Sequence, residues 1–218
     1  MKTKIKYYFI YSLLLMLSVS LIVSCGRSPD SDKVITDKDD MVAAFASVDE
    51  AIPRINDLSK GTLISEFTGF FMPAGNVVKD VLDFEKTEKG IHHIITQTYT
   101  KGDPDIFDNV SNEAISDTAY YQCYPKEGEP QKSFDKAEKL TVSQNEKGKI
   151  YKIDWSPEET EYYKSHFIQY LYSVYIIDNN GYLVESSIYA NSYEKESDGA
   201  KSNVVENTLK VKLIDYSK

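Results

Sequence analysis

Two adjacent histidines, His92 and His93, are the first candidates for metal binding in this sequence. They lie in a segment whose apolar residues alternate with a period of two, and neighbouring side chains on a strand point to opposite faces. Two imidazoles in that arrangement do not reach one ion, whereas residues two positions apart do. We therefore predict that neither histidine is a metal ligand.

An acidic segment has some of the side chains of a calcium-binding loop, namely Asp103, Asp105, Asp108 and Asn109. The third ligand position of such a loop falls on Phe107, and the glycine that the sharp turn requires is missing. We expect a solvated polar loop over residues 101–113.

The adjacent carboxylates of Glu158 and Glu159 are of the type used in acid–base catalysis. They follow Ser156-Pro157, and this order is typical of a helix start, where negative charge is favoured by the helix dipole. We therefore expect a short helix over residues 157–166. The chain has no Gly-rich phosphate loop, zinc spacing or serine nucleophile motif. We predict a protein that is not an enzyme and has no cofactor; a hydrolase is the least favoured alternative.

The first 24 residues have the three parts of a secretory signal peptide: three lysines, an apolar run and a small residue before the cleavage point. A membrane-spanning anchor is the alternative, because the run approaches the roughly 20 residues that cross a bilayer.

The residues Ile22-Val23-Ser24-Cys25 resemble the lipobox of bacterial lipoproteins. The resemblance implies that acyl groups such as palmitate are attached at Cys25 and that the signal is cut before it. It also implies a cell-membrane or outer-membrane location, with the body of the protein on the extracytoplasmic side. Two or more acyl chains are sufficient for stable anchoring.

The chain of 218 residues carries a net charge of −9, and loss of the lysine-containing signal makes the remainder more acidic. This charge disfavours nucleic acid or an anionic bilayer surface as the main partner. With Cys25 acylated, Cys123 has no cysteine to pair with, and we expect it to be a small core residue rather than a nucleophile.

The pattern after the signal predicts three regions. Residues 25–38 are polar and are expected to form a flexible tether. From Asp39 the apolar residues Met41, Phe45 and Val48 recur at helical spacing, and Pro53 predicts a kink or restart in that helix. Residues 39–218 show no break in composition and are expected to form a single domain.

Period-two segments after residue 61 predict strands. The turn Asp178-Asn179-Asn180-Gly181 should join two of them, 167–177 and 182–191, in a hairpin. Short turns favour an antiparallel meander. The expected fold is α+β: a strongly curved antiparallel sheet, or half-barrel, with the N-terminal helix and the short 157–166 helix on its concave face. The other expected strands are 62–72, 76–86, 90–100, 114–124, 139–143, 149–155 and 202–215.

This order of elements is similar to the lipoprotein-carrier superfamily of LolA-like and LppX-like half-barrels. The similarity depends mainly on Tyr151-Lys152-Ile153-Asp154 before the expected short helix, and on residues 175–183 around the hairpin turn. It implies a concave face that holds acyl chains or another apolar ligand, but it identifies no invariant functional residue.

Four residues on the expected hairpin are the candidate ligand contacts: Tyr170, Tyr172, Val174 and Ile188. The alternative is that they are ordinary core residues, since alternating aromatic side chains usually pack across strands. The predicted function is a membrane-anchored, non-enzymatic binding protein for a lipid or other apolar ligand. The alternative function is an interaction or sensor module that meets another cell-envelope protein without a small ligand.

Overall fold

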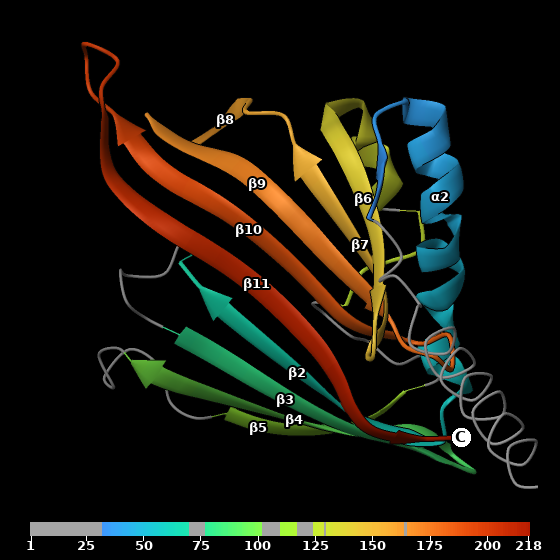
Figure 1. Cartoon of the computed structure of the whole chain (residues 1–218). Coiled ribbons are helices and arrows are strands. Elements are labelled where there is room, and N and C mark those ends of the chain that lie inside the picture. Colours follow the sequence, from blue (N-terminus) through green and yellow to red (C-terminus); the bar gives the residue numbers. More distant parts are fainter. Residues whose placement is uncertain (1–31, 70–76, 102–109, 117–123, 129, 164) are drawn as a thin grey trace, which may run out of the picture. The chain divides into compact units, whose positions relative to one another are not determined.

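An eleven-stranded antiparallel sheet dominates the computed structural model, which describes residues 32–69, 77–101, 110–116, 124–128, 130–163 and 165–218 (Figure 1). The chain divides into residues 1–32 and Lys33–Lys218, and the sheet belongs to the second part. In spatial order its strands are β1 (Lys33–Ile35), β6 (Ala137–Asn145), β7 (Gly148–Trp155), β9 (His166–Ile177), β10 (Leu183–Lys195), β11 (Lys201–Ser217), β2 (Lys60–Thr68), β3 (Val77–Thr87), β4 (Gly90–Lys101) and β5 (Val110–Ser116). Strand β8 (Glu159–Tyr163) pairs with β9 outside this order.

The helix α2 spans Lys38–Ala51. Asp37 caps it by accepting the backbone N–H groups of Asp39 and Asp40 at 3.0 and 3.1 Å. The expected interruption at Pro53 is confirmed. Helix α2 ends at Ala51, and the 3₁₀ helix η1 (Pro53–Asp57) begins at the proline.

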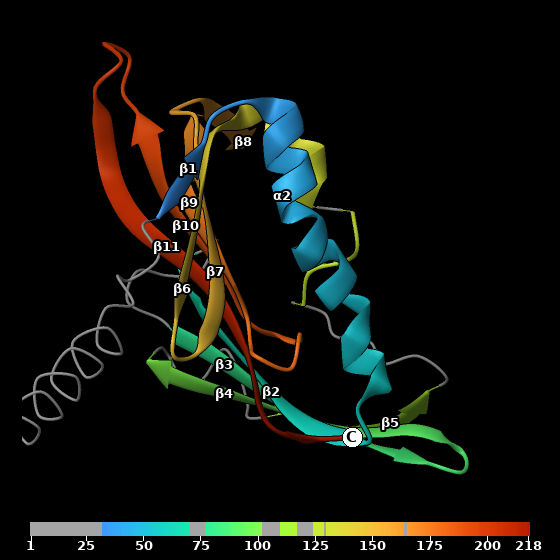
Figure 2. The same cartoon turned by 45° about the vertical axis from the view of Figure 1, so that its right-hand side comes forward.

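Phe45 of α2 is the centre of the core. Its ring makes edge-to-face contacts with Phe134 of the 3₁₀ helix η2 (Pro130–Lys136), with Tyr151 of β7 and with Tyr175 of β9, at centroid distances of 5.1, 6.1 and 5.0 Å. Helix α2 therefore lies on the face of β7 and β9 to which Tyr151 and Tyr175 belong (Figure 2). We call this the inner face and the opposite one the outer face.

The predicted hairpin of β9 and β10 is confirmed. Asp178 fixes its turn by accepting the N–H groups of Asn180 and Tyr182 at 3.0 and 2.8 Å. Gly181 follows in the left-handed region with φ of +82°.

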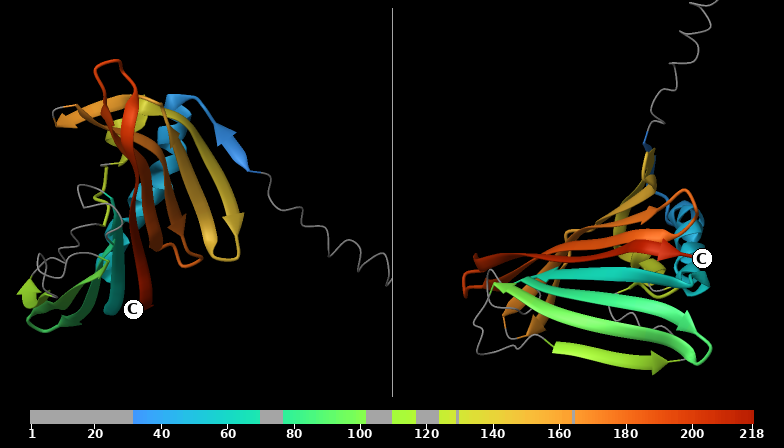
Figure 3. Two further views of the ribbon diagram at one scale, coloured as in Figure 1. Left: turned by 90° about the vertical axis from the view of Figure 1, so that its left-hand side faces the viewer. Right: turned by 90° about the horizontal axis from the view of Figure 1, so that it is seen from below.

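The strand partners differ from a simple meander, although every pairing is antiparallel. Strand β11 lies between β10 and β2, so segments far apart in the sequence are neighbours (Figure 3). The backbone N–H of Thr208 donates to Thr68 Oγ1 at 3.1 Å across this junction. Periodicity identifies the strands but does not determine which of them pair.

The expected helix over residues 157–166 is wrong. The chain there forms β8, whose residues Glu159, Thr160 and Glu161 pair with Gln169, Ile168 and Phe167 of β9. Strand β9 pairs with β7 only from Tyr172 to Ile177. Its first residues, beginning at His166, therefore leave an edge with which β8 pairs. That tertiary pairing overrides the local helix-start signals.

Two further boundaries differ from expectation. Lys33–Ile35, expected in the tether, pairs with β6, and Ile35 is buried in the core. Strand β5 begins at Val110, inside the segment expected to be a loop. The described part of the chain is therefore largely β, with one α-helix and two short 3₁₀ segments, rather than evenly α+β.

The signal segment, Cys25, residues 103–109 and Cys123 lie outside the described residues, so the expectations for them stay predictions. In the described segments, no helix has the length and apolarity needed to cross a membrane.

Candidate functional site

A cavity of about 390 Å³ opens on the inner face of the sheet. Strands β7, β9, β10 and β11 supply one side, and the segments around Tyr124 and Pro130, with the start of β8, supply the other. The side chains that characterise it, and for which we name it the aromatic cavity, are Tyr124, Trp155, Tyr170, Tyr175, Ile188 and Leu209.

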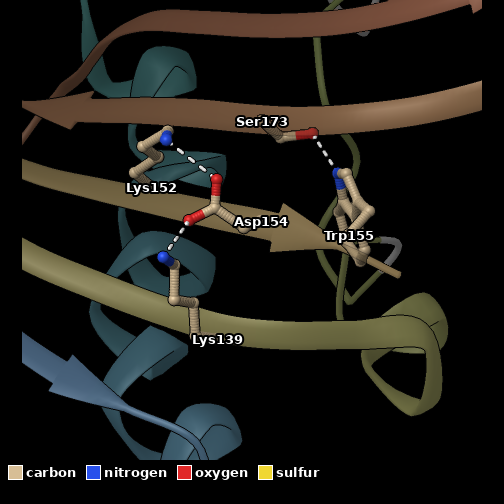
Figure 4. Close-up of polar contacts among 5 residues, drawn as sticks. All are labelled: Lys139, Lys152, Asp154, Trp155 and Ser173. Atoms are coloured by element: carbon tan, nitrogen blue, oxygen red, sulfur yellow. Dashed lines mark hydrogen bonds and ion pairs between the residues drawn. The ribbon is translucent and has the colours of Figure 1, made fainter. Parts of the chain in front are cut away.

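Trp155 and Ser173 form the central polar contact of this cavity. The indole N–H of Trp155 donates to Ser173 Oγ at 2.9 Å (Figure 4). Tyr175 lies two residues further along β9, and burial raises the pKa of its phenol far above the usual range, so the hydroxyl stays protonated. The wall that these residues form is polar but uncharged.

The four predicted ligand contacts divide between the two faces. Tyr170 and Ile188 line the aromatic cavity, whereas Tyr172 and Val174 do not. Tyr172 stacks on Tyr189 with ring centroids 4.3 Å apart, and Lys152 Nζ lies 4.7 Å from the Tyr172 centroid. Tyr172 therefore belongs to the outer face rather than to the hollow in which we expected it.

A β-bulge explains this division. Tyr189 pairs with Tyr172, but the next residue, Ala190, pairs with Tyr170, so Leu171 is an extra residue in β9. The extra residue shifts the alternation by one position, which places Tyr170 on the same face as Ser173. Strict alternation along the sequence predicts the opposite.

Sequence reasoning missed Tyr124, Trp155, Ser173, Tyr175 and Leu209 as lining residues. Trp155 had a usable signal, because it continues the apolar alternation of Tyr151 and Ile153 to the end of its strand. Tyr124 had none, because its placement depends on a distant contact: its hydroxyl donates to the Leu183 carbonyl at 2.9 Å.

Asp154 forms a separate polar cluster on the outer face. Its two carboxylate oxygens pair with Lys152 at 2.8 Å and Lys139 at 3.4 Å (Figure 4). Asp154 alternates with Trp155, so this cluster and the aromatic cavity lie on opposite sides of β7. The Lys139–Asp154 pair joins β6 to β7, and none of these three residues lines the aromatic cavity.

The two adjacent glutamates have different environments. Glu158 lines the aromatic cavity and lies 3.8 Å from Lys136, with both side chains largely exposed. Glu159 pairs with Lys195 and, at 2.8 Å, with Lys201, and these cations hold its pKa at about 2. The arrangement is not that of two carboxylates flanking one substrate.

The histidines lie on opposite faces of β4, as their alternation predicts. His92 Nε2 lies 2.6 Å from Glu113 Oε1, while His93 is buried opposite Ala114. In the described segments, no three His, Cys, Asp or Glu side chains form a group that could hold a metal ion.

No family model matches the chain, and no curated protein matches it. Among solved structures, the dehydratase domain from the CurJ module of curacin polyketide synthase is similar over 86% of this chain and 93% of that chain. The two share 8% sequence identity with a TM-score of 0.18. A similarity of this size assigns neither a fold family nor an activity.

Proposed function

We propose that this protein is a lipid-anchored, extracytoplasmic binding protein for a lipid or other apolar ligand, and that it catalyses no reaction. The aromatic cavity is the observation that carries this proposal. Its volume of about 390 Å³ falls in the range of small-molecule sites, which is roughly 300–1,000 Å³.

The lining of the aromatic cavity supports an apolar ligand. The lining includes the rings of Trp155, Tyr170 and Tyr175 and the aliphatic side chains of Ile188 and Leu209. A ligand that covers this apolar surface and removes it from water gains about 25 cal/mol per Å². Tyr170 is 42% exposed, so this coverage is incomplete in the protein alone. An acyl chain or another flat apolar group has the chemistry to complete it.

The finer description of the fold belongs to the same proposal. The inner face carries both α2 and the aromatic cavity, as the concave face of a half-barrel carries a helix and a ligand site. The similarity to LolA-like and LppX-like carriers then accounts for the cavity as a place for acyl chains.

Acylation at Cys25 would hold the protein at a bilayer, which is a source of lipid. An anchored protein of this design takes its ligand from the bilayer or from a partner at the bilayer.

Trp155 supplies a direct test of ligand binding, because it is the chain's only tryptophan and it lines the cavity. We expect 12-bromododecanoic acid to quench its fluorescence in the purified protein. Tyr170→Ala should weaken this binding about tenfold, the loss expected for one partly covered aromatic ring. Tyr172→Ala, on the outer face, is the matched control and should leave the affinity unchanged.

Absence of quenching in the wild type, or equal losses in the two variants, would reject the ligand-binding proposal. The interaction or sensor module would then be the surviving interpretation. Anchoring is tested separately by Cys25→Ala, which should move the protein out of the membrane fraction; a processed variant that stays with the membrane contradicts the lipobox reading.

A further inference from the structure

We propose that a second cavity, at the C-terminal end of α2, binds a phosphate-type dianion through Arg54 and Lys149. This cavity has a volume of about 360 Å³ and lies between the end of α2 with η1 and the turns of the β6–β7 and β9–β10 hairpins. We call it the cationic cavity. The proposal is independent of ligand binding in the aromatic cavity.

Arg54 is held in place by contacts that leave its charge unmatched. Its Nη1 donates to the Gly181 carbonyl at 3.1 Å, and its guanidinium carbon lies 5.2 Å from the centroid of the buried Tyr182 ring. A β-carbon at Gly181 would collide with Arg54 Nη1, so this position of the guanidinium requires glycine.

Lys149 is the second cation. Its Nζ lies 5.0 Å from the centroid of the Tyr151 ring, an arrangement in which the ring attracts the ammonium. Neither Arg54 nor Lys149 forms an ion pair with any carboxylate of the residues that the structure describes. Two positive charges therefore border one cavity, and neither forms an ion pair with a carboxylate of the described residues.

Tyr151 provides an independent observation. It lines the cationic cavity and is fully buried, and its hydroxyl has no hydrogen-bond partner in the described part of the chain. A buried hydroxyl without a partner is energetically unfavourable, because it loses its hydrogen bonds to water. An anion with several acceptor oxygens is the class of ligand that would use such a donor together with the two cations.

The two acidic residues of this cavity differ in their effect. Asp178 is already saturated, because its carboxylate accepts from Asn180, Tyr182 and Tyr216. Glu50 is exposed on α2 and lines the cavity, so its charge opposes an anion. Removal of the Glu50 charge should therefore strengthen phosphate binding. Removal of the Lys149 charge should weaken it.

The chemistry favours phosphate over other anions. An arginine fork matches the oxygens of phosphate in two parallel hydrogen bonds, and a lysine adds a point charge. Two cations match the charge of a phosphate dianion. The same group occurs as free phosphate and as the headgroup of phosphatidic acid, and these sources are distinguished by experiment.

The test uses the full chain in phosphatidylcholine nanodiscs, titrated with inorganic phosphate by calorimetry. A second arm replaces part of the phosphatidylcholine with phosphatidic acid and measures the protein's thermal midpoint, which rises if the headgroup binds. We expect Lys149→Gln to weaken binding at least tenfold and Glu50→Gln to tighten it about threefold. Arg54→Gln should also weaken binding, but Arg54 positions Gly181, so Lys149→Gln is the decisive variant.

Binding of free phosphate assigns a soluble source, and a midpoint shift with phosphatidic acid alone assigns the headgroup. The proposal is overturned if the wild type binds neither. It is equally overturned if Lys149→Gln binds as the wild type does, or if Glu50→Gln weakens binding. Quenching of Trp155 by the brominated fatty acid is unaffected by these variants, so failure here does not reject the aromatic cavity.

Discussion

The indole of Trp155 on β7 is hydrogen-bonded to Ser173 on β9, with 2.9 Å between Nε1 and Oγ (Figure 4). Ser173 is only 2% exposed, and Trp155 is partly buried beside it in the wall of the aromatic cavity. One hydrogen bond thus orients an aromatic ring of that wall.

Ser173→Ala removes the acceptor and leaves the indole N–H without its protein partner. We expect a loss of about 1 kcal/mol in the free energy of unfolding, measured with urea, and a shift in the emission maximum of Trp155. Ser186→Ala is the control on the neighbouring strand, since Ser186 is also buried but does not contact Trp155. An unchanged emission spectrum in Ser173→Ala would contradict the hydrogen bond.

Phe45→Ala should be the most damaging of the simple core truncations. Phe45 is fully buried among Phe134, Tyr151 and Tyr175, and loss of such a ring costs about 3–5 kcal/mol. Val42→Ala on the exposed side of α2 is the control and should change stability little. A loss in Phe45→Ala below about 1 kcal/mol would show that α2 is not packed on the sheet.

Glu159 should contribute to the pH dependence of stability. Its pKa is lowered from 4.5 to about 2 by Lys195 first and then by Lys201. A carboxylate with a lowered pKa stabilises the folded state above its unfolded pKa, and this contribution is lost as the pH falls towards the folded pKa. The difference between wild type and Glu159→Gln in thermal midpoint should therefore be largest above about pH 4.5 and vanish near pH 2.

High salt should reduce that difference at neutral pH, because the three charged groups are accessible to ions. Glu146→Gln, on the exposed β6–β7 turn, serves as the comparison and should show no such pH dependence. A wild-type advantage that grows on acidification would refute the assignment.

A comparison of Gly148→Ala with Gly199→Ala separates the cost of a positive φ from the cost of a steric collision at the β-carbon. Both have positive φ values, +135° and +84°, but a β-carbon at Gly148 would collide with the Ile177 backbone, whereas nothing lies within 4 Å at Gly199. Gly199→Ala should cost about 1–2 kcal/mol through its backbone alone. Gly148→Ala should cost clearly more in urea unfolding, and equal costs would contradict the close packing of the β6–β7 turn on β9.

The elements that follow from local sequence were predictable. Helix α2, its end at Pro53 and the β9–β10 hairpin each depend on residues within a few positions of one another, so the pattern contains the information. The capping and turn residues act locally, and their effects survive in the folded protein.

The features that depend on distant partners were not predictable. Residues 159–163 carry a helix-start pattern but form a strand because β9 offers an unpaired edge. Tyr170 and Tyr172 lie on opposite faces because of one extra residue, Leu171, and no sequence pattern predicts that bulge. The bulge separates Tyr170, which lines the aromatic cavity with Ile188, from Tyr172 and Val174, which do not line it.

The position of β11 has a consequence for how the protein comes to be folded. Strand β11 supplies a neighbour to both β10 and β2, yet β2 precedes it by about 140 residues. Until β11 has been synthesised, both partners present unpaired edges, which are templates for aggregation. Assembly of the whole sheet is thus a late, long-range event of the slow kind that high contact order imposes.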